Sequence, residues 1–209
     1  TGTKGMEQFF PADKILITGN PVRQNIANRA IEKEAALLQF GLLPNHFTIL
    51  IIGGSLGAAS INKAIQQNLA AFEKMGVQLI WQTGKPNAAS YKTAAEKFGN
   101  VYVDSFIQDM SAAYTAADMV VSRSGAMAVA EITITGKACI FVPYPHAAED
   151  HQTFNAKVLV DENAAAIGLA DGGRQFAQCL GHQTRLNTNV GVAHFSFNFR
   201  AWSQCSNGV

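Results

Sequence analysis

The run of residues 47–52 constrains the fold more than any other part of this 209-residue chain. It is almost continuously apolar and rich in β-branched residues, which is typical of a strand buried on both faces of a parallel sheet. Further strand patterns occur at 77–82, 101–103, 119–122 and 138–143, and helical patterns occur at 58–74, 88–98 and 111–117. Strands that alternate with helices across short loops predict an α/β fold, a Rossmann-like doubly wound parallel sheet.

The two ends of the chain differ from this middle part. Residues 14–19 read as a short first strand that ends before Asn20-Pro21, and residues 28–40 read as a helix with Ile31, Ala35 and Leu38 on its apolar face. We therefore expect a linker and first strand over 1–23 and a domain over 24–169. Residues 170–209 contain one acidic residue and show no helical period. We expect this tail to be poorly ordered or foreign to the rest.

Composition excludes several classes of protein. Hydrophobic residues make up 48% of the chain and charged residues 15%, which indicates a globular domain. A net charge of +1 without any basic run gives no electrostatic reason to expect nucleic acid binding.

The cysteines (Cys139, Cys179 and Cys205) are odd in number and widely spaced, so we expect a reducing compartment and no disulfide framework. The start, which has neither Met nor a signal-peptide layout, leads us to expect a fragment.

A strand, a small-residue turn and a helix follow one another over 119–131. Ser124 is a natural N-cap, and Gly125 and Ala126 leave the first helical turn open to a ligand. Glu131 lies on the same face as Ser124 and Ala128, about 10 Å further along the axis. This geometry suits a ligand that has a phosphate at one end and a diol at the other.

A purely structural interpretation of the same segment is also open. Glu131 could instead form an ion pair with Arg123 or Lys137, both of which are close in sequence. The segment would then be an ordinary connection between a strand and a helix.

A glycine-rich turn, 53–57, follows the buried strand at 47–52. Its glycines allow backbone amides to approach a phosphate, and Ser55 adds a hydroxyl donor. The turn is not a P-loop, because no Gly-Lys-Ser/Thr follows it. It is not the dinucleotide fingerprint either, because the spacing is GGxxG and the next strand ends in Gln82-Thr83-Gly84 with no acidic residue for a ribose. A turn with only a packing role is the alternative.

A proline-stiffened loop begins at Pro143 and leads into a helix that Asp150, His151 and Gln152 open, so that its first turn is polar. Gln152 and Asn155 are suited to contacting sugar hydroxyls, because sugars are recognised by short, fixed donors and acceptors. A metal site is the rival interpretation, with His146, Glu149, Asp150 and His151 as ligands. That spacing matches no familiar ligand pattern, and no Asp-x-Asp occurs, so we expect neither a metal nor a cofactor.

The segment 106–110 precedes the helix at 111–117. A flat base could lie against Phe106 and Met110, with the backbone of Ile107 contacting its edge. The alternative is that all three side chains belong to the core. A Ser-His-Asp hydrolase is the weaker alternative.

Four segments together resemble the C-terminal, donor-binding domain of glycosyltransferase family 28: residues 19–23, 53–58, 122–126 with Glu131, and 143–156. The resemblance covers about residues 5–168, in order and with matching spacing. It implies one half of a GT-B glycosyltransferase, an inverting enzyme that transfers N-acetylglucosamine from UDP to lipid-linked muramyl-pentapeptide in peptidoglycan synthesis (lipid I to lipid II). The implied partners are UDP-N-acetylglucosamine and the lipid-linked acceptor. The implied location is peripheral, on the cytoplasmic face of the bacterial inner membrane.

The resemblance also implies roles for individual residues. Arg23 and Ser55 would lie near the diphosphate, Ile107 at the uracil, and Gln152 on the sugar. Residues 126–131 would line the nucleoside, with Glu131 on the ribose hydroxyls. Where the family often has Gln, this chain has His151, so the role of that position is open. The full set of expected binding residues is Arg23, Gly54, Ser55, Gly57, Phe106, Ile107, Met110, Ser124, Gly125, Ala126, Met127, Ala128, Val129, Ala130, Glu131, His151, Gln152 and Asn155.

The catalytic base, the acceptor site and the membrane contact are expected in an N-terminal domain outside this chain. We therefore expect the fragment to bind the donor weakly and to turn over little. Two alternatives remain open: a stand-alone nucleotide-sugar-binding subunit that needs a separate acceptor-binding partner, and a UDP-sugar epimerase of the same architecture. Product analysis without an acceptor lipid distinguishes the epimerase.

Overall fold

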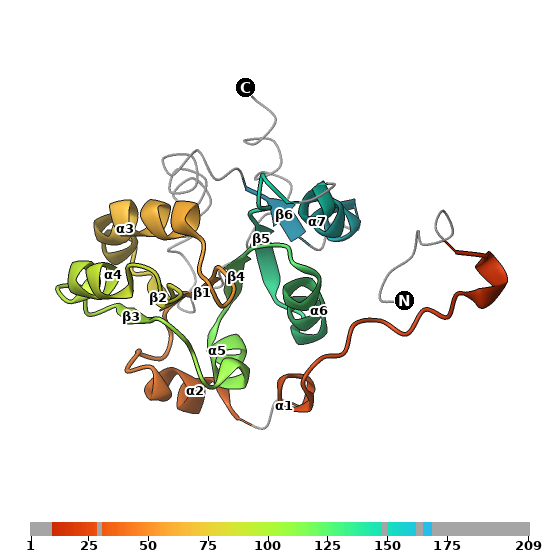
Figure 1. Ribbon diagram of the computed structural model, residues 1–209. Coiled ribbons are helices and arrows are strands. Elements are labelled where there is room, and N and C mark those ends of the chain that lie inside the picture. The colour runs from red at the N-terminus through yellow and green to blue at the C-terminus, as the bar shows by residue number, and fades with distance from the viewer. Residues whose placement is uncertain (1–9, 29–30, 148–149, 162–164, 169–209) are drawn as a thin grey trace.

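The computed structural model describes residues 10–28, 31–147, 150–161 and 165–168. Within them, six parallel strands form one sheet in the order β3-β2-β1-β4-β5-β6. This order is that of a doubly wound Rossmann-like fold, so the predicted fold class is confirmed (Figure 1). The strands are β1 (Thr48–Ile52), β2 (Gln78–Gln82), β3 (Val101–Asp104), β4 (Met119–Ser122), β5 (Ala138–Phe141) and β6 (Ala165–Ile167).

Helices cover both faces of the sheet. In the view of Figure 1, α3 and α4 lie above strands β1 to β3, and α2 and α5 lie below them. The helices are α1 (Gln24–Ala27), α2 (Lys33–Gln39), α3 (Ala59–Lys74), α4 (Ala88–Ala95), α5 (Met110–Ala116), α6 (Ala126–Thr135) and α7 (His151–Asp161). None of the helices in the described part of the chain is both long enough and apolar enough to cross a membrane.

Strand β1 supplies both halves of the hydrophobic core. Leu50 and Ile52 pack in the cluster that contains residues of α1, α2, α5 and α6, whereas Ile49 and Ile51 pack in the cluster that contains residues of α3 and α4. All five residues of β1 are buried. The uninterrupted apolar pattern at 47–52 therefore has a direct physical cause, because neither face of this strand contacts water.

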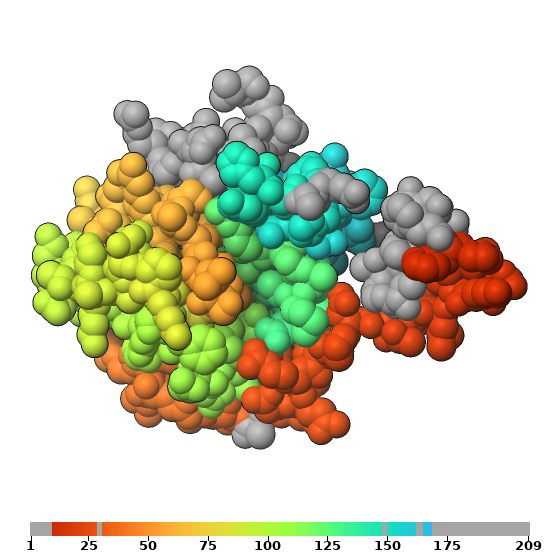
Figure 2. Space-filling view, in the orientation of Figure 1, coloured from red at the N-terminus to blue at the C-terminus, as the bar shows by residue number. Residues whose placement is uncertain are grey.

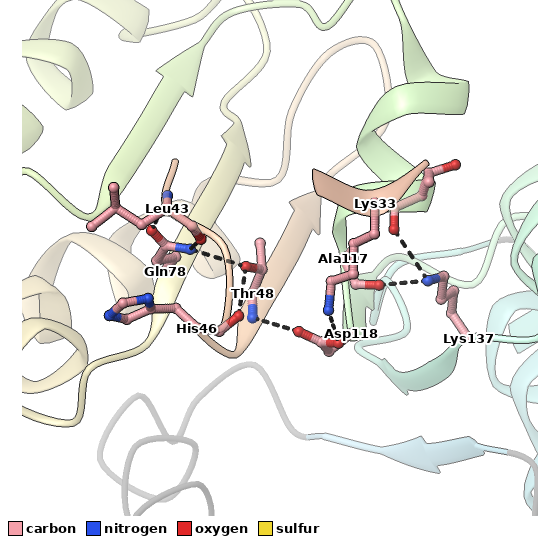
Figure 3. Close-up of polar contacts among 9 residues, drawn as sticks. Lys33, Leu43, His46, Thr48, Gln78, Ala117, Asp118 and Lys137 are labelled. Carbon is pink, nitrogen blue, oxygen red and sulfur yellow. Dashed lines mark hydrogen bonds and ion pairs between the residues drawn. The ribbon is translucent and has the colours of Figure 1, made fainter. Parts of the chain in front are cut away.

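Polar side chains fix the edge of the sheet at which the strands begin (Figure 3). The Gln78 amide accepts a hydrogen bond from Leu43 N and donates one to Leu43 O, both at 2.8 Å. Asp118 accepts a hydrogen bond from Thr48 N at 2.9 Å and forms an ion pair with Lys33. These contacts provide hydrogen-bond partners for backbone groups next to β1 and β2. The polar side chains at this edge therefore stabilise the fold.

Residues 14–19 do not form the expected strand, and that prediction is wrong. A 3-10 helix, η2 (Ala12–Lys14), is followed by extended chain, and Leu16 and Ile17 are 73% and 48% exposed. Figure 1 shows this segment running outside the sheet, where no strand is available to pair with it. An apolar sequence alone does not make a strand when the partner is missing.

Other element boundaries also differ from the sequence prediction. Of the described residues in the helix expected over 28–40, only 33–39 are helical, as α2, and the short helix α1 precedes the expected range. The buried residues of α2 are Ala36 and Leu37, whereas Leu38 of the expected apolar face is 70% exposed. Helix α4 ends at Ala95, before the expected residue 98. Strand β6 was not predicted, since its three residues are too short to show a period. The prediction for 170–209 falls outside the described residues.

Asn62 links α3 to β2 within the core. Its side chain is 3% exposed, donates to Thr83 O at 2.7 Å and accepts from the indole nitrogen of Trp81 at 3.0 Å. We expect Asn62→Leu to lower the free energy of unfolding by about 3 kcal/mol, because both partners would lose a buried hydrogen bond. Gln67→Leu on the exposed face of α3 is the control and should change it by about 0.5 kcal/mol at most. Urea denaturation measures both, and equal effects would contradict this account.

Candidate functional site

A crevice of about 1090 Å³ lies outside the carboxyl ends of β1 and β4. The chain leaves β1 toward α3 on one face of the sheet and leaves β4 toward α6 on the other, so the two loops diverge. Ligands bind at such points in open α/β sheets. The space-filling view shows the segment after β1 (orange) bordering α6 (green) and the 143–147 segment (teal), and residues from all three line the crevice (Figure 2).

The glycine turn after β1 both packs and lines the crevice. A Cβ on Gly57 would lie 2.0 Å from Thr83 O, and one on Gly53 would lie 2.3 Å from Ala58 N. These two glycines therefore pack closely against backbone, and both also line the crevice. Gly54, at φ +83°, has open space where a Cβ would be, and Ser55 beside it is exposed. This part of the turn presents backbone and a hydroxyl to the crevice.

Helix α6 begins without a side-chain cap, and the prediction that Ser124 is the N-cap is wrong. Gly125 occupies the cap position. Ser124 is fully buried and donates its hydroxyl to Gln152 O at 2.7 Å, while its own carbonyl accepts from Asn155 Nδ2 at 3.0 Å. The serine thus ties the turn after β4 to α7. No side chain caps the start of the helix, which suits an anion.

The Glu131 carboxylate lies inside the crevice and has two partners. One oxygen, Oε1, accepts from Nε and Nη2 of Arg23 at 3.2 and 3.1 Å. The other, Oε2, accepts from the hydroxyl of Tyr114 at 3.2 Å. All three residues line the crevice. The alternative in which Glu131 pairs with Lys137 or Arg123 is wrong, because Lys137 donates to Ala117 O and Arg123 is engaged elsewhere.

Arg123 holds two walls of the crevice together. Its guanidinium donates to the carbonyls of Val142 and Pro143 at 2.9 and 2.8 Å and to Ser60 Oγ at 2.8 Å, and it lies 5.5 Å from the ring centre of Tyr144. Burial lowers the pKa of Arg123 from its ordinary value. Sequence reasoning did not single out this residue as part of the site, because its partners are distant in the chain.

Gln82 has a similar role on the opposite wall. Its side-chain oxygen accepts from Ile107 N at 2.9 Å, and its amide nitrogen donates to Gly54 O at 3.3 Å. One side chain therefore positions both the glycine turn and the 105–109 loop.

Phe106 is 45% exposed and lines the crevice, so the core alternative is wrong for it. Ile107 and Met110 do belong to the core, although Met110 also lines the crevice.

Of the expected binding residues, twelve line the crevice: Arg23, Gly54, Ser55, Gly57, Phe106, Met110, Gly125, Ala126, Met127, Ala128, Glu131 and Gln152. Six do not: Ile107, Ser124, Val129, Ala130, His151 and Asn155. Lining residues that sequence reasoning did not select include Ser60, Gln82, Tyr114, Arg123, Tyr144 and His146. Their role depends on contacts between distant segments, which a single sequence does not reveal.

Helix α7 is present as predicted, and it begins at His151, one residue after the expected start at Asp150. The Gln152 side-chain oxygen accepts from Tyr144 N at 3.0 Å, which holds the 143–147 segment against this helix. The rival metal site has no support in the described part of the chain, where no group of three or more His, Cys, Asp and Glu side chains could hold an ion. Glu149, one of its four candidate ligands, lies outside the described residues.

Comparisons with known proteins agree on one family. The family model of the glycosyltransferase family 28 C-terminal domain matches residues 48–171. UDP-N-acetylglucosamine--N-acetylmuramyl-(pentapeptide) pyrophosphoryl-undecaprenol N-acetylglucosamine transferase from Bacteroides thetaiotaomicron is 52% identical over 165 residues, covering 77% of this chain and 44% of the relative. The protein of the same name from Phocaeicola vulgatus is 49% identical, with the same shares covered.

A solved structure supports the same assignment. MurG from Acinetobacter baumannii superimposes with a TM-score of 0.61 at 25% identity, covering 96% of this chain and 55% of that one. The chain spans less than half the length of the curated relatives that it matches.

The close packing at Gly57 makes a specific prediction. Gly57→Ala should lower the free energy of unfolding by about 3 kcal/mol, since its Cβ would collide with the backbone of Thr83. Gly41→Ala is the matched control, because Gly41 has a similar φ of +66° but open space around it, and should cost about 1 kcal/mol. Chemical denaturation measures both values. A Gly57→Ala variant as stable as the Gly41→Ala variant would show that the turn does not pack as described.

Proposed function

Because this chain belongs to the glycosyltransferase family 28 C-terminal domain family, we propose that it is the donor-binding half of an N-acetylglucosaminyltransferase. The donor is UDP-N-acetylglucosamine and the acceptor is lipid-linked muramyl-pentapeptide, as the names of the curated relatives state for those proteins. The observation that carries the proposal is the convergence of the turn after β1 and the uncapped start of α6 on one crevice, with a carboxylate within it.

The crevice offers a complementary group for each part of the donor. The uncapped start of α6 and the backbone at Gly54 and Ser55 suit the diphosphate, because backbone N–H groups and the helix dipole favour anions. Glu131 suits the ribose diol, since a carboxylate accepts two hydroxyl hydrogen bonds. Phe106 provides an exposed ring for the uracil.

Gln152 lies on the wall formed by α7 and is the group that we assign to the N-acetylglucosamine moiety. The loop that precedes it is held by Arg123 and by the Gln152 side chain itself. A sugar that binds there would meet a wall whose position is fixed before binding.

The reaction that we assign is a direct displacement with inversion. A hydroxyl of the acceptor attacks the anomeric carbon of the sugar, the bond to the diphosphate oxygen breaks, and UDP leaves. The start of α6 and the Arg23 guanidinium would stabilise the negative charge that develops on the diphosphate. The curated relatives are more than twice as long as the segment that this chain matches. We assign the acceptor site, the general base and peripheral attachment to the cytoplasmic face of the membrane to the part that it does not match.

Calorimetric titration of the chain with UDP-N-acetylglucosamine tests the proposal. We expect binding, and we expect Glu131→Ala to weaken it about tenfold, because the ribose hydroxyls would lose a charged hydrogen-bond acceptor. Affinity for pyrophosphate should not fall, because pyrophosphate has no diol.

Glu73→Ala, at an exposed position on α3, removes the same charge outside the crevice and is the control. Absence of binding to the unmodified chain would refute the donor site. An equal loss of affinity for pyrophosphate in Glu131→Ala would refute the ribose role.

A further inference from the structure

Tyr114 is a buried side chain whose polar end reaches the crevice. It belongs to α5, every residue of which is buried, and it is 1% exposed. Its hydroxyl donates to Glu131 Oε2 at 3.2 Å from the inner side of the crevice wall. Because the ring is enclosed by the core cluster that also contains Ile132 and Cys139, the hydroxyl has little freedom to move away.

Arg23 contacts the same carboxylate from the solvent side. Its side chain is 52% exposed, whereas that of Glu131 is 12% exposed. Arg23 lies in the extended segment outside the sheet, at the N-cap position of α1. A long, half-exposed side chain gains little from an ion pair and exchanges its partner readily. The two oxygens of Glu131 therefore have one fixed partner and one exchangeable partner.

Tyr114 is protonated, so its hydroxyl can serve as a constant hydrogen-bond donor. Burial, and then the neighbouring charge of Glu131, raise the pKa of Tyr114 far above its ordinary value. The phenol therefore remains protonated around neutral pH, and its O–H can donate a hydrogen bond to the carboxylate.

We propose that Tyr114 is a positioning residue for Glu131, holding one carboxylate oxygen so that the other exchanges between Arg23 in the free protein and the ribose diol in the donor complex. This inference rests on the proposed function, which assigns Glu131 to the ribose. The displaced guanidinium of Arg23 then becomes available to the diphosphate in the same crevice. Arg23 thus opposes binding of the nucleoside and favours binding of the diphosphate.

The first test compares UDP with 2′-deoxy-UDP in calorimetric titrations of the full chain. Tyr114→Phe should weaken UDP binding about tenfold and 2′-deoxy-UDP binding about twofold or less, because only an intact diol uses the positioned carboxylate. Tyr91→Phe, a buried tyrosine on α4 at the opposite face of the sheet, is the matched control and should change neither. Equal losses for both nucleotides, or no loss for either, would overturn the positioning role.

The second test separates the two effects of Arg23. Arg23→Ala should raise the affinity for uridine about threefold, because the competing ion pair is gone, and should lower the affinity for UDP about tenfold. Uridine affinity that is unchanged or reduced would overturn the exchange. Failure of the unmodified chain to bind UDP would instead refute the proposed function, so the two failures are distinguishable.

Discussion

The parallel pairing of β1 with β4 determines where the crevice of this molecule forms. The two strands are neighbours in the sheet, but the chain leaves them toward opposite faces, to α3 and to α6. No connection can fill the space between two loops that diverge, so a crevice is left at the carboxyl edge. Everything that we assign to the donor site lies around this crevice, whereas the polar groups at the other edge stabilise the backbone.

Long-range hydrogen bonds hold the walls of the crevice in place. Arg123 joins the start of α3 to the segment after β5, and Gln82 joins the glycine turn to the loop before α5. The polar groups of these two side chains form hydrogen bonds with backbone groups and a hydroxyl within the protein. The groups that line the crevice include backbone, hydroxyls, the Gln152 amide, the Glu131 carboxylate and the Arg23 guanidinium. Such a set is suited to a neutral sugar attached to a charged diphosphate.

The sequence predicted the central strands and helices because their burial is nearly complete and their period is therefore clear, as at 47–52. It failed at 14–19, where the apolar residues Leu16 and Ile17 are exposed, and at β6, which is too short to show a pattern. Glu131 and the glycine turn could be found from local spacing. Tyr114, Gln82 and Arg123 could not, since their roles depend on partners that are distant in the chain. Ser124 was misassigned for the same reason, because its hydroxyl contacts α7 instead of capping α6.

A crystal structure of the chain with UDP-N-acetylglucosamine would locate the donor. We predict that the diphosphate lies against the start of α6 and the glycine turn, and that the ribose diol lies on Glu131 with Arg23 turned away from that carboxylate. A donor bound outside the crevice, or a donor in the crevice with the pair of Arg23 and Glu131 intact and the ribose elsewhere, would contradict it.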